Sequence, residues 1–192
     1  GNFPVTFASY GDITSPTLLL DERKCRRNID RMTAGARQAS AHFRPHLKTH
    51  QSRRVAGWMR DAGVKAVTVS SVPMAEYFAD AGWTDITIAF PHNPRETARV
   101  NALAERCRLG LVVESPRVVR HLQTHLTHAA DLYVKIDTGS GRTGIPWHDS
   151  TAITAVLDAV YSAPQLLPAG LLTHGGDTYH AGGPEDVRRR FD

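Results

Sequence analysis

The sequence has 192 residues, enough for one domain with a buried core, and its 41% hydrophobic and 22% charged residues are ordinary for a globular protein. It contains no apolar run near the roughly 18 residues that a membrane span needs, and it does not begin with a signal-peptide pattern. We therefore expect a folded, cytoplasmic protein without a membrane partner.

The charge and the cysteines exclude two further classes. The formal net charge of +4 would permit nucleic-acid binding, but the arginines are scattered instead of forming a basic stripe with interleaved aromatic residues. We therefore expect no nucleic-acid partner, and the positive balance suits a small anionic ligand. Cys25 and Cys107 lie in or at the end of helical patterns, which indicates core positions in a reducing compartment and no disulfide framework.

Short β-branched segments alternate along the chain with segments of helical spacing, which is typical of repeated βα units around a parallel sheet. The strands predicted in chain order are 17–21, 42–48, 66–71, 85–90, 109–114, 131–137 and 167–174. The segments between them carry apolar residues at helical spacing, as at Cys25, Ile29, Met32 and Ala36.

The predicted helix boundaries carry local signals. Asn93 and Ser115 each precede a proline, which predicts an N-cap followed by a first-turn proline. The tripeptide Asp-Ala-Gly occurs at 61–63 and again at 80–82, where glycine is expected to end a helix before the next strand. This repetition favours a repeated β/α architecture.

A (β/α)8 barrel needs roughly 250 residues and eight strands. The sequence gives seven strands, and it ends in what looks like the start of another helix after Gly183 and Pro184. We therefore predict an α/β fold of the (β/α)8 TIM-barrel type that is truncated before barrel closure.

The most informative segment is the predicted strand 42–48. Alternation with period two places Arg44, His46 and Lys48 on one face and the apolar residues between them on the other. The polar face would point into the barrel, with Lys48 at the carboxyl end of the strand, where such barrels place their chemistry. Like charge from Arg44 and His46 together with partial burial would favour a free amine, which can attack a carbonyl and form a Schiff base.

Simpler interpretations of these residues stay open. Lys48 could be a solvated residue at a helix start. His42, His46 and His50 have the four-residue spacing of a helical metal site, but Pro45 and the period-two pattern argue against a helix here. The pair His121 and His125, in a helical segment, is interpreted as part of an exposed polar face.

The segment RPHLKTH at 44–50 resembles the cofactor-lysine motif of the D-threonine aldolase and D-serine dehydratase family. That family belongs with alanine racemase to the fold-type III enzymes of pyridoxal 5'-phosphate (PLP). The similarity extends from about residue 15 to residue 179. It implies an alanine racemase type of barrel, with PLP as cofactor and Lys48 as the catalytic residue that forms the Schiff base.

Two further segments support the resemblance. KIDTGSGRTG at 135–144 looks like the family's K-x-D-T-G-x-x-R-x-G segment, which implies that Arg142 binds the phenolic oxygen of PLP or the substrate carboxylate. LLTHGGDTY at 171–179 is similar to an H-x-G-x-[ST]-Y segment, which implies that His174 stacks on the pyridine ring and that Tyr179 lines the pocket. The resemblance also places His46 among the cofactor-binding residues. Lys135 would support the Arg142 loop or pair with Asp137.

The resemblance also implies a domain arrangement. Residues 1–21 are expected to contribute a strand to a β-rich domain outside this sequence, and 22–192 to form an incomplete PLP-binding β/α barrel. Residues outside the sequence would bind a divalent metal, Zn or Mn, and the full-length protein would be a homodimer.

The activity implied is that of a PLP-dependent lyase, a dehydratase or aldolase, acting on small D-3-hydroxy amino acids such as D-serine, D-threonine or 3-hydroxyaspartate. The alternatives are an amino-acid racemase of the same fold and a PLP-carrying protein without turnover.

Overall fold

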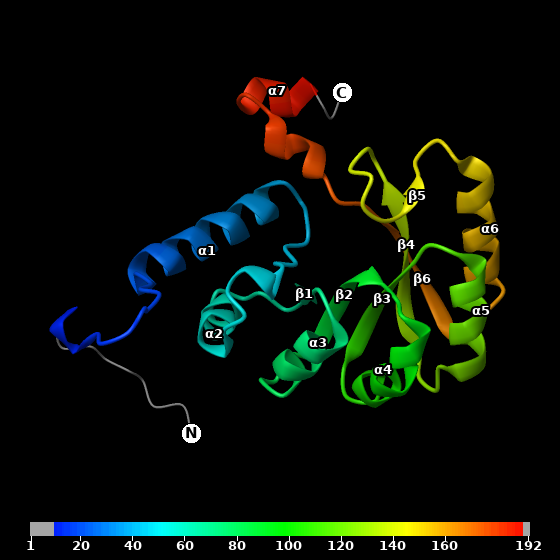
Figure 1. The fold of residues 1–192 in the computed structure, drawn as a ribbon, viewed down its shortest axis with the longest axis horizontal. Helices are drawn as coiled ribbons and strands as arrows, with labels where there is room; N and C mark the ends of the chain where they lie inside the picture. Colours follow the sequence, from blue (N-terminus) through cyan, green and yellow to red (C-terminus); the bar gives the residue numbers. More distant parts are fainter. Residues whose placement is uncertain (1–9, 190–192) are drawn as a thin grey trace.

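The structure is a computed structural model that describes residues 10–189 and contains one parallel sheet covered by helices (Figure 1). The strands are β1 Val67–Val69, β2 Asp85–Pro91, β3 Arg108–Val113, β4 Ala130–Asp137, β5 Ile145–Pro146 and β6 Leu166–Leu172. The α-helices are α1 Glu22–Gln38, α2 Arg53–Asp61, α3 Val72–Ala79, α4 Thr97–Ala104, α5 Pro116–His125, α6 Ser150–Tyr161 and α7 Pro184–Arg189. Short 3-10 turns lie at Tyr10–Asp12, Leu47–Thr49, Pro94–Glu96 and Gly176–His180.

The sheet is built from successive βα units. Strands β1, β2, β3 and β4 pair in chain order, and β6 then pairs with β4, always in parallel. The two-residue strand β5 pairs with the carboxyl end of β4. Because every strand pair is parallel, all strand carboxyl ends lie at one edge of the sheet. The predicted α/β class is thereby confirmed, and the arrangement is consistent with part of a TIM-type barrel.

The main core lies between the sheet and the helices. Leu109, Leu111 and Val113 project from β3 toward the helices and are at most 1% exposed. Phe78 of α3 and Leu122 of α5 are fully buried in the same cluster. Figure 1 shows α3 and α4 beside β1–β3, with α5 and α6 packed side by side next to β4 and β6. This packing leaves the strand ends free to carry polar residues.

The predicted helix-capping signals are confirmed. Ser115 accepts a hydrogen bond from the N–H of Val118 at the start of α5, and Asn93 accepts one from Arg95 at the start of the 3-10 turn before α4. Gly63 and Gly82 end their helices with φ of 86° and 84°, a left-handed conformation that favours glycine. The helix predicted after Pro184 is α7, and residues 190–192 lie outside the described part of the chain.

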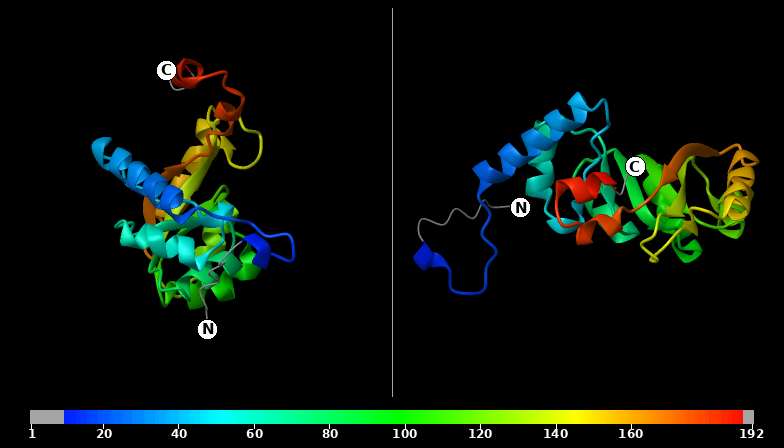
Figure 2. Two further views of the ribbon diagram at one scale, coloured as in Figure 1. Left: turned by 90° about the vertical axis from the view of Figure 1, so that its left-hand side faces the viewer. Right: turned by 90° about the horizontal axis from the view of Figure 1, so that it is seen from above.

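The first two predicted strands are not formed as expected. No strand forms over 17–21; this segment is extended without a sheet partner among the described residues, and Leu18 is 94% exposed. Figure 2 shows it extending away from the helices and the sheet. Residues 1–9 of the predicted N-terminal segment lie outside the described residues, and its docking on a second domain stays a prediction. Within residues 10–189, segment 42–48 contributes a single bridge, between His46 and Thr68.

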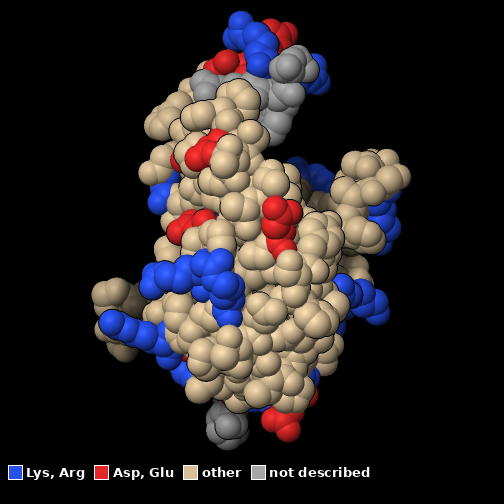
Figure 3. All heavy atoms as spheres, turned by 90° about the vertical axis from the view of Figure 1, so that its right-hand side faces the viewer, with Lys and Arg blue, Asp and Glu red and all other residues tan. Residues whose placement is uncertain are grey.

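Charged residues are distributed over the surface. Figure 3 shows separate groups of Lys and Arg among acidic and uncharged side chains on the side of α5 and α6, without a continuous basic stripe among the described residues of that face. Within residues 10–189, none of the helices has the length and apolar character needed to cross a membrane.

Candidate functional site

Lys48 lies in a tight turn at the carboxyl end of the sheet. The chain runs beside β1, bridges to it at His46 and enters the 3-10 turn Leu47–Thr49. Pro45 and Leu47 are buried, His46 is half-buried and the Lys48 side chain is exposed. The predicted alternation of faces is therefore present, although a full strand is not. Leu47, at 0% exposure, anchors the turn in the core and leaves the amine of Lys48 accessible.

The prediction that Arg44 crowds Lys48 is wrong. Arg44 Nη1 lies 2.7 Å from the carboxylate of Asp85 and 3.4 Å from the carbonyl oxygen of Val67. Both partners are the first residues of their strands, so the guanidinium is held at the amino end of the sheet, opposite Lys48. The negatively charged acceptor Asp85 thus determines where the long Arg44 side chain lies. Asp85 is 41 residues away in sequence.

His46 is the closer neighbour of Lys48. Its Nδ1 accepts the backbone N–H of Lys48 at 3.3 Å, and its Nε2 lies 3.5 Å from Ser70 Oγ. Burial lowers the pKa of His46 to about 4, and the positive charges of Lys48 and His174 add to this effect. The imidazole is therefore neutral near pH 7.

The loop between β4 and β5 is organised by Asp137. Its carboxylate accepts hydrogen bonds from the backbone N–H groups of Gly139, Ser140 and Gly141 at 2.8–3.2 Å, and one from the Ser140 hydroxyl. The hydrogen bond from Gly139 is the largest cause of the lowered pKa of Asp137. Since its carboxylate is engaged by the loop, Asp137 fixes the backbone that carries Arg142.

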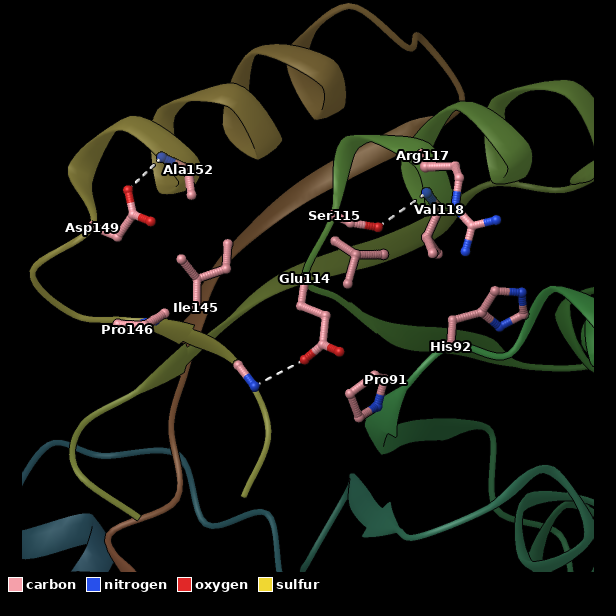
Figure 4. Close-up of a pocket in the computed structure, with 12 residues that line it drawn as sticks. Pro91, His92, Glu114, Ser115, Arg117, Val118, Ile145, Pro146, Asp149 and Ala152 are labelled. Carbon is pink, nitrogen blue, oxygen red and sulfur yellow. Dashed lines mark hydrogen bonds between the residues drawn. The ribbon is translucent and has the colours of Figure 1, made fainter. Parts of the chain in front are cut away.

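The far end of this loop is fixed by close packing. Gly144 has φ of 111°, and a Cβ atom there would lie 2.8 Å from the backbone nitrogen of Asp137 and from the carbonyl carbon of Ile136. Only glycine fits this position. The Gly144 N–H donates to Glu114 Oε2 at 2.8 Å (Figure 4). Glu114 and Gly144 also line a cavity of about 450 Å³ between the starts of α5 and α6.

Positive groups converge at this end of the sheet. Lys135 is 2% exposed, and its pKa is lowered by burial and then by the charge of Arg142, while Asp137 and Glu114 act in the opposite direction. The pKa of His174 is lowered by burial and then by the charges of Arg142, Lys48 and Lys135. Residues from three separate segments therefore act on one another electrostatically.

The five predicted site residues lie at the same end of the sheet. These electrostatic interactions link Lys48, His46, Arg142 and His174. Tyr179 contacts this group through His174, and the centroids of the two rings are 5.8 Å apart. Tyr179 is 74% exposed, and Arg142 is also exposed.

Sequence reasoning missed two supporting contacts. One is the hydrogen bond of Glu114 to Gly144. The other joins the hydroxyls of Thr138 and Thr173 at 2.8 Å and ties the Arg142 loop to the end of β6. Both join segments about 30 residues apart and leave no periodic pattern in the sequence.

An accessible primary amine surrounded by an arginine, two histidines and a buried lysine suits a ligand that carries an aldehyde and a phosphate group. The donor set of the described residues thus fits PLP. Among these residues, no group of three or more His, Cys, Asp or Glu side chains is arranged to hold a metal ion.

The chain belongs to the family described as alanine racemase, N-terminal domain, whose model matches residues 20–189. It is 31% identical over 180 residues to D-threo-3-hydroxyaspartate dehydratase of Delftia sp. (strain HT23), covering 92% of this chain and 47% of that protein. It is 28% identical over 190 residues to 3-hydroxy-D-aspartate aldolase of Paracoccus denitrificans (strain Pd 1222), covering 94% of this chain and 48% of that protein.

Solved structures agree with this assignment. The fold superposes on D-threonine aldolase from Filomicrobium marinum with a TM-score of 0.87 and 29% identity, covering 94% of this chain and 50% of the other. Alanine racemase from Bacillus anthracis, 19% identical with a TM-score of 0.71, shares the fold. The predicted alanine racemase type of fold is confirmed. The chain spans about half the length of the relatives it matches.

Proposed function

We propose that the protein is a PLP-dependent lyase acting on D-3-hydroxy amino acids, as a dehydratase or an aldolase, with PLP attached through Lys48. The observation that carries this proposal is the accessible Lys48 amine within the electrostatic cluster formed with His46, His174 and Arg142. The names of the relatives, a 3-hydroxyaspartate dehydratase and D-hydroxy amino-acid aldolases, support the substrate class.

Each residue has a distinct role in this proposal. When bound, PLP withdraws electrons from the Cα atom of an attached amino acid. The Lys48 amine would hold PLP covalently, and as a free amine, once the substrate amine has displaced it, it would take up a proton on its face of the substrate. Arg142 binds an anionic oxygen of the cofactor or of the substrate, and its guanidinium is suited to a carboxylate. His174 would pack on the cofactor ring, and Tyr179 would line the pocket.

His46 and Lys135 complete the surroundings. The neutral His46 imidazole accepts the Lys48 N–H and holds the turn. The buried Lys135 lies under the Arg142 loop and adds positive charge where an anionic cofactor would bind. We further propose that the enzyme uses a divalent metal, which the solved metal-free form of a mutant of the related dehydratase supports, and that it is a cytoplasmic homodimer.

Borohydride reduction of the full-length protein with PLP, followed by peptide mapping, tests the central residue. We expect a phosphopyridoxyl label on Lys48, no label in Lys48→Arg, and an unchanged label in Lys65→Arg, since Lys65 lies at the amino end of the sheet. A label on another lysine would contradict the proposal.

The activity needs a separate assay with D-serine, D-threonine and D-3-hydroxyaspartate in the presence of PLP and Mn²⁺ or Zn²⁺. Ammonia and a keto acid identify a dehydratase, and glycine with an aldehyde identifies an aldolase. Formation of the opposite enantiomer alone would indicate a racemase, and transfer of PLP to an apoenzyme without turnover would indicate a carrier.

A further inference from the structure

The turn that carries Lys48 lies between two imidazoles that make the same backbone hydrogen bond. His46 Nδ1 accepts the N–H of Lys48 at 3.3 Å, and His50 Nδ1 accepts the N–H of Ser52 at 3.0 Å. Each bond spans two residues, as in an Asx turn. Because Nδ1 is the acceptor in both, each neutral ring carries its proton on Nε2.

The two histidines differ at their second nitrogen. His46 Nε2 lies 3.5 Å from Ser70 Oγ, facing the site. His50 Nε2 is buried and has no hydrogen-bond partner among residues 10–189, and the ring meets fully buried Phe78 edge-on at 6.4 Å. A buried N–H group without a hydrogen-bond partner destabilises the fold. An apolar side chain would therefore be more stable here if the residue served only to pack the core. The useful atom of His50 is therefore Nδ1.

The bond to Ser52 determines how the chain leaves the Lys48 turn. Gln51 has φ of 45°, which is unfavourable for a residue with a side chain, and Ser52 then caps α2 by accepting the N–H of Val55. On the other side, the N–H groups of His50 and Gln51 both donate to the carbonyl oxygen of Leu47. His50 thus connects the turn to the first residues of α2.

We propose that His50 is a positioning residue for Lys48: its Nδ1 holds the Ser52 backbone so that the Lys48 turn and α2 keep a fixed relation. This inference rests on the proposed function, because a fixed position of Lys48 matters only if Lys48 binds PLP. Burial lowers the pKa of His50, which keeps the imidazole neutral and able to accept.

Two substitutions in the full-length protein separate the acceptor from the ring. In His50→Asn, the side-chain oxygen takes the place of Nδ1, and His50→Leu fills similar space without an acceptor. The surface variant His128→Leu serves as a control. Two quantities are measured: the PLP concentration that gives half-maximal borohydride-trapped label on Lys48, and the hydrogen-exchange rate of the amides in 48–55.

We expect His50→Leu to require about five- to tenfold more PLP, the effect of one lost hydrogen bond, and to exchange the Ser52 amide faster. His50→Asn and His128→Leu should match the wild type in both measurements. Wild-type behaviour of His50→Leu would overturn the inference, and so would a His50→Asn protein that is impaired as strongly as His50→Leu.

Two further outcomes are decided by the same data. If His50→Leu does not fold, His50→Asn decides alone, because it lacks the ring and keeps the acceptor: wild-type loading supports the inference, and tenfold weaker loading overturns it. A wild-type protein without label on Lys48 would refute the proposed function itself, which is a result distinct from any difference between the variants.

Discussion

Glu114 at the end of β3 accepts the backbone N–H of Gly144 at 2.8 Å and thereby closes the loop that carries Arg142. Glu114→Leu removes the acceptor and should lower the free energy of unfolding by about 1–2 kcal/mol. Glu114→Gln keeps an acceptor oxygen and should retain slow exchange of the Gly144 amide. The free energy is measured by urea denaturation, and equal loss in both variants would contradict this role.

The charge of Glu114 has a separate effect on Lys135. Since this carboxylate raises the pKa of Lys135, both Glu114→Gln and Glu114→Leu should lower that pKa further. The measurement is the pH dependence of chemical modification of Lys135. An effect in only one of the variants would show that the loop conformation, not the charge, controls the lysine.

Gly144 should not tolerate a side chain. A Cβ atom would lie 2.8 Å from two backbone atoms of neighbouring β4 residues, and φ is 111°. We expect Gly144→Ala to destabilise the fold by about 2–4 kcal/mol and to weaken PLP loading of Lys48. The control is Gly35→Ala in α1, where the described residues place no atom within 4 Å of the new methyl group other than the chain neighbours and the backbone of the same helix. That variant should gain up to about 1 kcal/mol in thermal or urea unfolding.

The ion pair of Arg44 with Asp85 should support the fold and not the chemistry. Both side chains are 26% exposed, so Arg44→Met should reduce the free energy of unfolding by about 1–3 kcal/mol and leave the label on Lys48 unchanged. In Lys24→Met, loss of the exposed ion pair with Asp21 at 4.0 Å should leave the free energy of unfolding essentially unchanged. If folded Arg44→Met lost the label on Lys48, Arg44 would act on Lys48, as the sequence predicted.

Acid should destabilise the protein through His92. Thr97 Oγ1 donates to the carbonyl oxygen of Pro94, so it accepts from Nε2 of both His92 and His121, each at 3.0 Å. Burial, followed by the charge of His121, lowers the pKa of His92 to about 4. The unfolded chain, with a histidine pKa near 6.5, therefore binds more protons than the folded protein between pH 6.5 and 4.

The free energy of unfolding should consequently be unaffected by His92 above pH 6.5, fall as the pH decreases toward 4 and level off below it. His92→Gln keeps an N–H for Thr97 without the titration, so its urea unfolding should depend less on pH in this range. Some pH dependence of the free energy of unfolding remains in His92→Gln, because the pKa of His46 is also lowered to about 4. Identical pH profiles for both proteins would contradict the assignment.

The sequence was sufficient for features that depend on local chemistry. The N-caps before Pro94 and Pro116 and the glycines at 63 and 82 were predicted correctly, because capping and positive φ are properties of a few adjacent residues. The inward and outward alternation around Lys48 was also correct, since burial of Pro45 and Leu47 follows from their apolar character.

Contacts between distant segments could not be predicted. Arg44 was assigned to Lys48 because they share a face, but Asp85 across the sheet offered a stronger partner. The predicted strand 42–48 failed because Pro45 has no N–H to donate and the 3-10 turn begins directly after His46. Two-residue strand β5 is too short for any periodic pattern.

Strand β6 has one further consequence. Among the described residues it is paired only with β4, and Leu167 and Leu171 are 46% and 61% exposed. A strand with free N–H and C=O groups along one edge and leucines on its surface readily recruits the same strand of another molecule. Any preparation in which residues 166–172 remain uncovered should therefore precipitate or form β-rich aggregates as its concentration rises, and a charged substitution such as Leu171→Lys should improve its solubility.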